Sequence, residues 1–317
     1  MLSIEPSLSA TAPRVAAIEA GGTKFWVNAG TRDTLLSEPE RFATATPEIT
    51  LPHIIAALRG AFARQPFQAI GIATFGPVGV NPQAENYGVI GSTPKAGWQG
   101  FNFLSALAEF GVPVAVDTDV NAAALAEAAQ HTGTQDDRLV YITVGTGIGG
   151  GIAIGGQPSN GVSHPELGHI RVARHPEDPL PSGICPFHDH CLEGLASGPA
   201  IYRRWGCDLG QLPQIHPGHR LTAYYLAQLC TTLLLTLAPG RIVLGGGVMS
   251  TPALLGKVRQ QTEQLLGGYL TGTEVFDSPT QRITAPELAP LSGLAGAGML
   301  AENVLRKQAD EKQTNEP

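Results

Sequence analysis

The chain has 317 residues, enough for one large core or two domains, and a formal net charge of −7 at pH 7. Its 20 lysines and arginines are scattered without a basic stripe, so neither nucleic acid nor an anionic membrane is an expected partner. No segment is long and apolar enough to span a bilayer, and the N-terminus lacks the apolar core of a signal peptide. The four cysteines do not suggest a disulfide framework, which favours a cytoplasmic protein acting on small molecules.

A pattern of strand, glycine-rich turn and strand occurs at residues 15–30 and again at residues 139–156, which predicts two related halves. After a disordered segment at 1–13, strands at 15–18 and 25–29 flank Gly21 and Gly22, which permit the positive backbone angles of a tight hairpin turn. A helix is predicted over 49–63 and buried strands over 68–73 and 112–116. An alanine-rich helix then begins at Asp119, capped by Asp119 or Thr118.

The second half opens with the repeated hairpin and continues into an irregular arm, residues 157–195. Helices are predicted over 198–205 and 221–237, and a buried strand over 242–244 leads into Gly245, Gly246 and Gly247, a transition that often faces a nucleotide. A helix rich in small residues over 293–304 is expected to pack back on the first half, and the polar tail 307–317 is expected to be disordered. Alternating strands and helices indicate an α/β fold with two lobes.

The two glycine-rich hairpins can present backbone amides to phosphate oxygens, because glycine lets the main chain approach a ligand closely. Two such loops facing each other would straddle a triphosphate. Taken singly, each is better read as a plain hairpin, and the repetition is what favours a phosphate site. Neither is a P-loop, since GxxxxGK[ST] is absent, and GTGIGGG at 145–151 is followed by a strand, which weakens a dinucleotide-binding interpretation.

Asp119 stands where a strand ends and a helix starts, so its carboxylate could accept a proton from a sugar hydroxyl that attacks phosphorus. It is the strongest candidate for a catalytic base. Asp117 competes on sequence alone, and a plain helix cap is the alternative for either residue. Glu127 is assigned to a solvated or structural face of the same helix. The loop at 87–103, with Lys95 and Trp98, is expected to shape the pocket, a dimer contact or lid edge being the alternative.

The arm contains a set of zinc-ligating residue types, namely His169, Cys185, His188 and Cys191, bracketed by Glu166 and Glu193. Reduced thiols and surface histidines are the alternative. His190 competes with His188, and His164 or His175 could replace His169. With four protein ligands the zinc would be structural, because no open position remains for activating water.

Several motifs together resemble one family, the ROK sugar kinases, and within it the bacterial fructokinase branch. The segment VGTGIGGGI at 144–152, followed by Gly161, Pro165, Gly168 and His169, resembles the ROK signature. The fructokinase branch is similar in particular at EAGGTK (19–24), STPKAGW (92–98), DTDVNAAALAE (117–127) and HPELGH (164–169). The resemblance extends from Val15 to about Ala301.

The resemblance implies an actin-like, RNase H-like fold with two lobes, a cleft between them that closes on ATP and a hexose, and a zinc-stapled arm. The small lobe would comprise 14–117 and 293–306, and the large lobe 118–292. Asp119 would be the general base, while Glu166, His169, Glu193, Thr118 and Pro77 would contact the sugar. ATP would lie against three sets of residues: Gly21, Gly22, Thr23 and Lys24; Gly145, Thr146, Gly147 and Gly149; and Gly245, Gly246 and Gly247. The chain departs from the family at Glu19, where most members have Asp, at Thr118, where Asn is common, and in its CxxHxxC arm.

The expected activity is magnesium- and ATP-dependent phosphorylation of fructose at O6 by a homodimer. A kinase for glucose, mannose or an N-acetylhexosamine is the nearest alternative, because epimers are separated by a few hydrogen bonds in the closed site. A sugar-responsive repressor is disfavoured, since about fourteen residues precede the first strand, too few for a helix-turn-helix domain. A sugar sensor without catalysis is the other rival.

Overall fold

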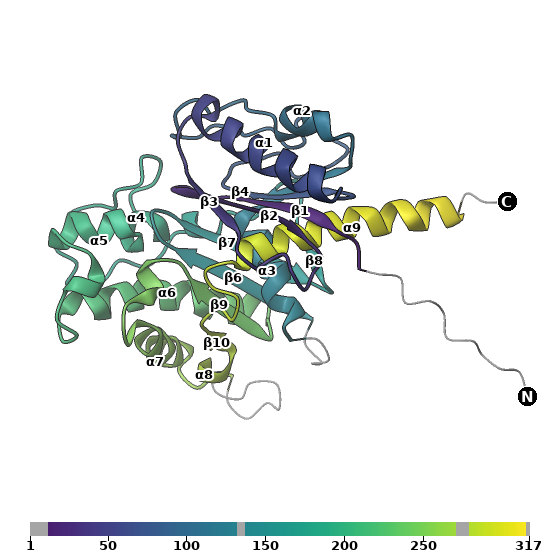
Figure 1. Ribbon diagram of the computed structural model, residues 1–317. Coiled ribbons are helices and arrows are strands. Elements are labelled where there is room, and N and C mark those ends of the chain that lie inside the picture. The colour runs from purple at the N-terminus through teal and green to yellow at the C-terminus, as the bar shows by residue number, and fades with distance from the viewer. Residues whose placement is uncertain (1–11, 132–136, 271–278, 315–317) are drawn as a thin grey trace, which may run out of the picture.

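The computed structural model describes residues 12–131, 137–270 and 279–314. It contains two five-stranded mixed sheets with helices between and outside them (Figure 1). The strands of the first sheet are β1 (Val15–Ala20), β2 (Lys24–Gly30), β3 (Glu40–Ala43), β4 (Ile70–Thr74) and β5 (Val114–Thr118), in the order β3-β2-β1-β4-β5. Those of the second are β6 (Arg138–Val144), β7 (Ile148–Ile154), β8 (Gln157–Pro158), β9 (Arg241–Gly245) and β10 (Ile283–Thr284), in the order β10-β9-β6-β7-β8.

The two sheets share one topology, which confirms the predicted internal repeat. In each sheet the first two strands form an antiparallel hairpin, β1 with β2 and β6 with β7, and a third strand extends it antiparallel. The remaining strands pair in parallel on the other side, β4 and β5 beside β1, and β9 and β10 beside β6. The carboxyl ends of the parallel strands of each sheet therefore lie at one edge, which is where ligands bind in open α/β sheets.

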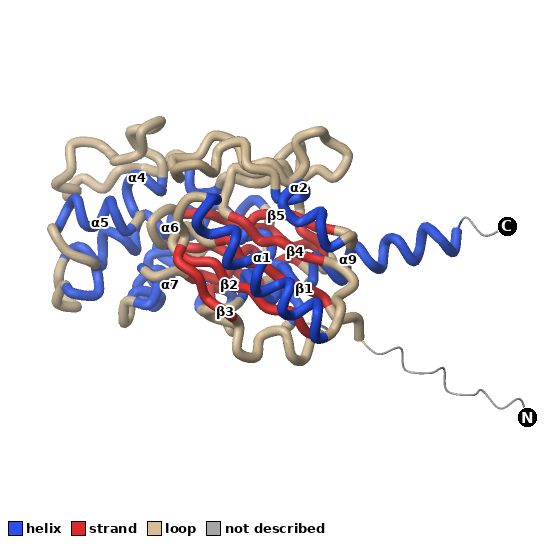
Figure 2. Tube along the Cα trace, turned by 45° about the horizontal axis from the view of Figure 1, so that its top comes forward, coloured by secondary structure: helices blue, strands red, loops and turns tan. Residues whose placement is uncertain are grey.

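The helices form three layers around the sheets. On the outer face of the first sheet lies α1 (Pro47–Arg64), with α2 (Phe103–Leu107) nearby (Figure 2). Between the sheets run α3 (Asp119–Ala129) and α9 (Ser292–Thr314), which pack on each other (Figure 1). The second sheet carries α6 (Pro217–Thr236) and α7 (Leu254–Leu266) on its other side. The short helices are α4 (Leu192–Ala196), α5 (Gly198–Trp205) and α8 (Pro279–Arg282).

Small residues allow α3 and α9 to approach closely. A Cβ on Gly296 of α9 would lie 1.9 Å from the carbonyl oxygen of Ala122 on α3, so only glycine fits there. The predicted packing of this last helix on the first half is confirmed, because α9 contacts β1, β4 and β5. Apolar residues on one side of α3 pack with α9 and the first sheet, and those on its other side pack with the second sheet. The start of α3 is thereby fixed between both sheets.

Three expectations from the sequence are wrong. The tail 307–317 was expected to be disordered, yet α9 continues to Thr314, because its sequence LRKQADEKQT is rich in helix formers and contains neither Gly nor Pro. Gly21 and Gly22, both in the described part of the chain, do not have positive φ. Trp98 does not line a pocket: it is fully buried, stacks on Phe25 and donates a 2.7 Å hydrogen bond to the Ala45 carbonyl. Residues 1–11 of the predicted disordered N-terminus lie outside the described residues.

Candidate active site

The start of α3 carries two aspartates with different surroundings. Asp117, at the end of β5, is 4 % exposed and its carboxylate accepts hydrogen bonds from the backbone amide of Thr118 and from the side-chain amides of Asn121 and Asn160, at 2.7, 2.7 and 3.0 Å. Both of its oxygens are therefore engaged. Asn160 lies at the beginning of the arm, so this network joins β5, α3 and the arm. No motif in the sequence pointed to Asn160.

Asp119, the first residue of α3, keeps more chemical freedom. One carboxylate oxygen accepts a 2.9 Å hydrogen bond from the backbone amide of Val120, and among the described residues no side chain donates to the other. Burial is the main cause that raises the pKa of Asp119 to about 6; backbone hydrogen bonds and the positive charge of Lys95 oppose the rise, and the negative charge of Glu166 adds to it. A carboxyl group with a pKa near 6 is ionised at neutral pH and still basic enough to take a proton. The structure thus favours Asp119 over Asp117 as the base.

Thr118 has a structural task. Its hydroxyl oxygen accepts a 3.1 Å hydrogen bond from the backbone amide of Asn121, so Thr118 and not Asp119 is the N-cap of α3. Its side chain is 3 % exposed. A hydroxyl that accepts this one bond keeps its O–H for donation, so Thr118 stays a candidate contact of the sugar.

Lys95 connects the base to the first glycine hairpin. Its ammonium donates a 3.2 Å hydrogen bond to the carbonyl of Gly22 and lies 4.8 Å from the centre of the Phe75 ring. Burial lowers the pKa of Lys95, and the nearby Asp119 carboxylate counteracts this. The predicted pocket loop at 87–103 therefore contributes Lys95 to the site and Trp98 to the core.

The first hairpin turn carries Gly21, Gly22, Thr23 and Lys24 between β1 and β2. The backbone amide of Gly21 donates to the Lys24 carbonyl at 2.9 Å, and the Thr44 hydroxyl donates to the Gly21 carbonyl at 2.8 Å, which closes the turn. Beside this turn, on β1, Glu19 has a pKa raised to about 7, mainly by burial and also by the negative charge of Asp119, whereas Lys24 lowers the pKa. One Glu19 oxygen is buried and finds no hydrogen-bond donor among the described residues. Such an oxygen is a suitable ligand for a cation.

The second hairpin, between β6 and β7, is contacted by Glu193 of the arm and by the first residue of α5, Gly198. Thr146 is exposed at its tip, and the Gly145 carbonyl accepts a 2.7 Å bond from the backbone amide of Gly198 at the start of α5. One oxygen of Glu193 accepts a 2.9 Å hydrogen bond from the Ile148 amide. A Cβ on Gly147 would lie 2.7 Å from that same oxygen, so a larger residue would displace it. Gly149 lies on β7, opposite Thr143.

The third glycine group follows β9, where Gly246 has a φ of 91° and a Cβ there would lie 2.4 Å from the Val144 carbonyl oxygen. This φ and this contact both require glycine. Gly245 is buried, while Gly246 and Gly247 are exposed. Because β9 pairs in parallel with β6, Gly245 lies beside Thr143, two residues before the second hairpin. The two predicted nucleotide-facing glycine segments are therefore neighbours at one edge of the second sheet.

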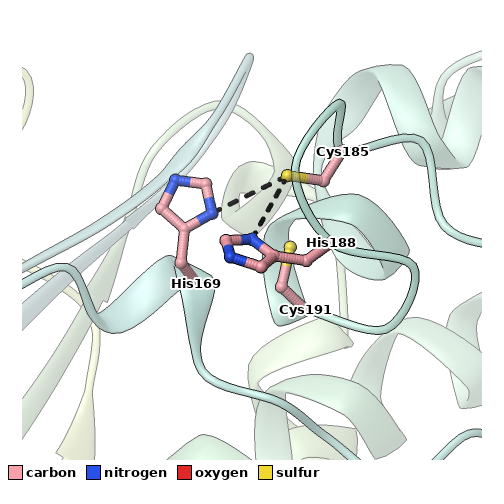
Figure 3. A group of neighbouring side chains, drawn as sticks. All are labelled: His169, Cys185, His188 and Cys191. Carbon is pink, nitrogen blue, oxygen red and sulfur yellow. Dashed lines mark hydrogen bonds between the residues drawn. The ribbon is translucent and has the colours of Figure 1, made fainter.

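The arm brings its predicted metal ligands together (Figure 3). The ligand atoms of His169, Cys185, His188 and Cys191 all lie within 4.8 Å of one another. Cys185 Sγ is 3.6 Å from His188 Nδ1 and 3.9 Å from His169 Nδ1. A tetrahedral zinc with ordinary bond lengths separates sulfur and nitrogen ligands by about 3.6 Å, so the donor set and spacing fit that metal. Burial raises the pKa of the Cys191 thiol to about 11.

The competing histidines are engaged elsewhere. His164 accepts a 3.3 Å bond from the Val78 amide and lies 3.5 Å from Glu166, which links the arm to the loop that contains the exposed Pro77. His175 Nδ1 accepts from the Glu177 amide at 3.1 Å, and His190 is not among the four clustered side chains. His169 and His188 are therefore the two histidines whose ring nitrogens lie near the thiols of Cys185 and Cys191.

His169 also faces the second hairpin through its other nitrogen. Its Nε2 is 3.9 Å from the Glu193 oxygen that does not bind Ile148. A carboxylate behind a ligating histidine is the usual way to orient such a ligand. The cluster is thus connected through Glu193 to the Gly145–Gly149 hairpin. Glu166 is about half exposed, at 52 %, although it lies beside His164.

A buried ion pair, missed by the sequence reasoning, anchors the arm. Asp178 accepts two hydrogen bonds from Arg204 on α5, at 2.8 and 2.9 Å, and a third from the Tyr225 hydroxyl on α6 at 2.6 Å. The Asp178 and Arg204 side chains are 0 % and 1 % exposed. Burial alone would raise the pKa of Asp178, but the bonds from Arg204 and Tyr225 hold it below its ordinary value.

Residues 15–304 match the sequence model of the ROK family. The chain belongs to the ROK family. A fructokinase from Zymomonas mobilis is 40 % identical over 289 residues, which cover 90 % of this chain and 95 % of that relative. A fructokinase from Pediococcus pentosaceus is 39 % identical over 291 residues, which cover 92 % and 98 %. Among solved structures, a ROK hexokinase from Thermus thermophilus has a TM-score of 0.72 and 27 % identity, covering 93 % of this chain and 99 % of that one.

These comparisons agree with the architecture of two related mixed sheets, the actin-like arrangement expected from the resemblance. Within the described residues, none of the helices is both long enough and apolar enough to cross a bilayer. All four cysteines are free thiols.

Proposed function

We propose that this ROK protein is an ATP-dependent fructokinase that transfers the γ-phosphoryl group of ATP to O6 of fructose. The observation that carries the proposal is the start of α3, where Asp119 has a carboxylate oxygen that receives no hydrogen bond from a described side chain, a pKa of about 6 and the cation of Lys95 nearby. A base and a cation side by side suit the deprotonation of a hydroxyl that attacks a phosphoryl group. The two fructokinase relatives support fructose as the acceptor.

In this proposal the triphosphate lies between the hairpins Gly21–Lys24 and Gly145–Gly149, and the adenosine beside Gly245–Gly247. Lys95 bridges to the first hairpin through the Gly22 carbonyl, so its charge offsets that of the transferring phosphoryl group. Asp119 accepts the proton of the sugar O6 hydroxyl. Glu166, His169 and Glu193 orient the other hydroxyls, and Pro77 borders the acceptor. Closure of the lobes 14–117 with 293–306 and 118–292 would exclude water and limit hydrolysis of ATP.

Two metal ions fit the residues present. Magnesium would be held near Glu19, whose buried oxygen has no donor among the described residues, and it would offset phosphate charge when bound. Zinc would be held by His169, Cys185, His188 and Cys191, and it would fix the arm. Through His169 and Glu193 the fixed arm would orient both the acceptor sugar and the Ile148 amide of the second hairpin. The zinc is structural in this proposal, and no chemical step depends on it.

We further propose that the chain works in the cytoplasm as a homodimer. Its free cysteines suit a reducing compartment, and exposed apolar side chains such as Val162 and Phe187 on the arm suit burial in a subunit contact. Light scattering of the purified protein that gave the mass of a single chain would contradict the dimer.

A panel of hexoses assayed for ADP release with ATP and magnesium tests the function. Fructose should have the highest kcat/KM, above glucose and mannose, and N-acetylhexosamines should be poor acceptors. A higher kcat/KM for an N-acetylated sugar would assign a different kinase, and absence of ADP release with every hexose would indicate a sensor without catalysis. For each sugar, a reaction without protein gives the background.

A further inference from the structure

A cavity lies far from the proposed active site. It has a volume of about 450 Å³ and is bordered by the end of α3, the middle of α9 and the first residues of β6 and β9. Four arginines line it: Arg32, Arg138, Arg241 and Arg306. The mechanism proposed above uses none of them.

The cavity and the proposed active site lie at opposite ends of the same elements. Asp119 is the first residue of α3, whereas Ala128 and Ala129 at its other end border the cavity. Eleven helical residues separate the ends of α3 by roughly 15 Å. Likewise β6 and β9 begin at the cavity, with Arg138 and Arg241, and end beside the glycine segments. A ligand in the cavity would therefore not occupy the ATP or hexose site.

Positive charge dominates the cavity. Among its described lining residues the carboxylates are Asp137 and Glu302, so the four guanidinium groups give these residues a surplus of two positive charges on a chain whose net charge is −7. Burial raises the pKa of Glu302, whereas Arg32 and Arg306 lower it, which shows that both guanidinium groups lie near this one carboxylate. Arg138 lies 3.9 Å from Asp137 and donates to the Leu237 carbonyl at 3.0 Å. Arginine forks pair with phosphate oxygens in a bidentate manner.

We propose that this cavity binds a small molecule that carries phosphate groups. Its volume falls in the usual range of small-molecule sites, about 300–1,000 Å³, and is too small for a nucleic acid duplex. Apolar side chains, including Leu125, Leu139 and Met299, complete the walls and would contact the carbon part of the ligand. The occupant is therefore an organic phosphate or a short phosphoanhydride.

The arginines come from both halves of the molecule. Arg32 follows β2 of the first sheet and Arg306 lies on α9, which packs on that sheet, whereas Arg138 and Arg241 begin strands of the second sheet. An anion bound by Arg32 and Arg306 from one half and by Arg138 and Arg241 from the other would link the two halves at the end of α3 opposite to Asp119. Occupancy of the cavity should therefore change the affinity of the protein for its sugar, and the sugar should change the affinity for the anion by the same factor.

The test uses inorganic pyrophosphate as the probe, titrated by calorimetry in magnesium-free buffer. Pyrophosphate should bind the wild-type protein, and the double variant Arg32→Gln with Arg306→Gln should bind it at least about tenfold more weakly, since each charge-assisted bond contributes about 1.5–3 kcal/mol. Arg241→Gln alone should also weaken pyrophosphate binding, and this single variant replaces the double variant as the test if the double variant fails to fold. Arg64→Gln, an exposed arginine on α1 outside the cavity, is the matched control and should bind normally.

Lys24→Met separates this cavity from the proposed ATP site. If the variant in the first hairpin loses pyrophosphate while the cavity variants keep it, the anion binds at the hairpins and the proposal is wrong. A wild-type protein that does not bind pyrophosphate contradicts it as well. With pyrophosphate bound, the fructose affinity should shift in the wild-type protein and not in the double variant, and an unshifted affinity would contradict the coupling. This last readout rests on the proposed function, whereas pyrophosphate binding does not, so the two failures can be told apart.

Discussion

Replacing Asp119 by Asn should remove activity and at the same time stabilise the fold. Burial raises the pKa of this carboxyl from 3.8 to about 6, so ionisation of Asp119 costs folding free energy at neutral pH. Two pKa units at 1.36 kcal/mol each amount to about 3 kcal/mol, and the partial exposure of the side chain reduces this to about 1–3 kcal/mol. Loss of a general base should lower kcat by about 10²–10⁴.

The pH dependence of that stability gain follows from the sign of the shift. Below pH 3.8 the carboxyl is protonated in both the folded and unfolded states, so Asp119→Asn should change nothing there. Between pH 3.8 and 6 the unfolded state ionises first and the penalty grows, and above pH 6 it is complete. Urea unfolding at pH 5.0 and pH 7.5 should therefore give a stabilisation at pH 5.0 that is about half of that at pH 7.5.

Asp117→Asn is the matched control, two residues away. Burial raises the pKa of Asp117 as well, but Asp117 accepts hydrogen bonds from Thr118, Asn121 and Asn160. An amide there would place N–H donors against N–H donors, which outweighs the loss of the buried charge, so the variant should be less stable by about 1–3 kcal/mol. If Asp119→Asn, correctly folded, is no more stable than the wild type at pH 7.5, the carboxyl does not have a raised pKa. If it keeps near-normal turnover, Asp119 is not the base.

Three further changes test other parts of the site. Lys95→Met should lower kcat about 10²-fold. Because Lys95 lowers the pKa of Asp119, the variant should also shift the acidic limb of the kcat/KM pH profile to a midpoint above pH 6, and an unshifted limb would contradict this contact. Elemental analysis should find one zinc per chain in the wild-type protein and none in Cys191→Ser, whose KM for both fructose and ATP should rise. Cys207→Ser, outside the cluster, should retain the metal. Asp178→Ala should destabilise the protein by about 3–5 kcal/mol in urea unfolding, because it leaves Arg204 buried without its partner, and a loss below about 1 kcal/mol would show that the pair is not buried in solution.

The repeated hairpins made the architecture predictable. A strand, a glycine turn and a strand at two places predicted two related halves, and the strands themselves have the same order in both sheets. The helix predicted at about 198–205 is α5, and in the structure Ser197 caps its start and Gly206, with a φ of 73°, ends it. The tail was misjudged because polar composition was read as disorder, although its residues favour helix.

Long-range contacts limited the prediction of the site. Trp98 was placed in the pocket, since nothing local reveals that Phe25 and Phe75 surround it. Glu127 was assigned to a solvated or a structural face of its helix, and the structure shows that the face is structural. The Glu127 carboxylate accepts hydrogen bonds from the Glu287 and Leu288 amides and the Ser292 hydroxyl, more than 150 positions away. The choice between His188 and His190 likewise needed the fold of the arm. Spacing identifies residue types for a site, whereas packing decides which of them meet.

The most direct test of the account is the identity of the product formed from fructose and magnesium ATP, followed by phosphorus NMR. The wild-type protein should convert ATP into ADP with equimolar fructose 6-phosphate, and a folded Asp119→Asn protein should form the same product at least about 10²-fold more slowly. Phosphorylation at another hydroxyl, release of inorganic phosphate in place of the sugar phosphate, or an undiminished rate in the variant would contradict it.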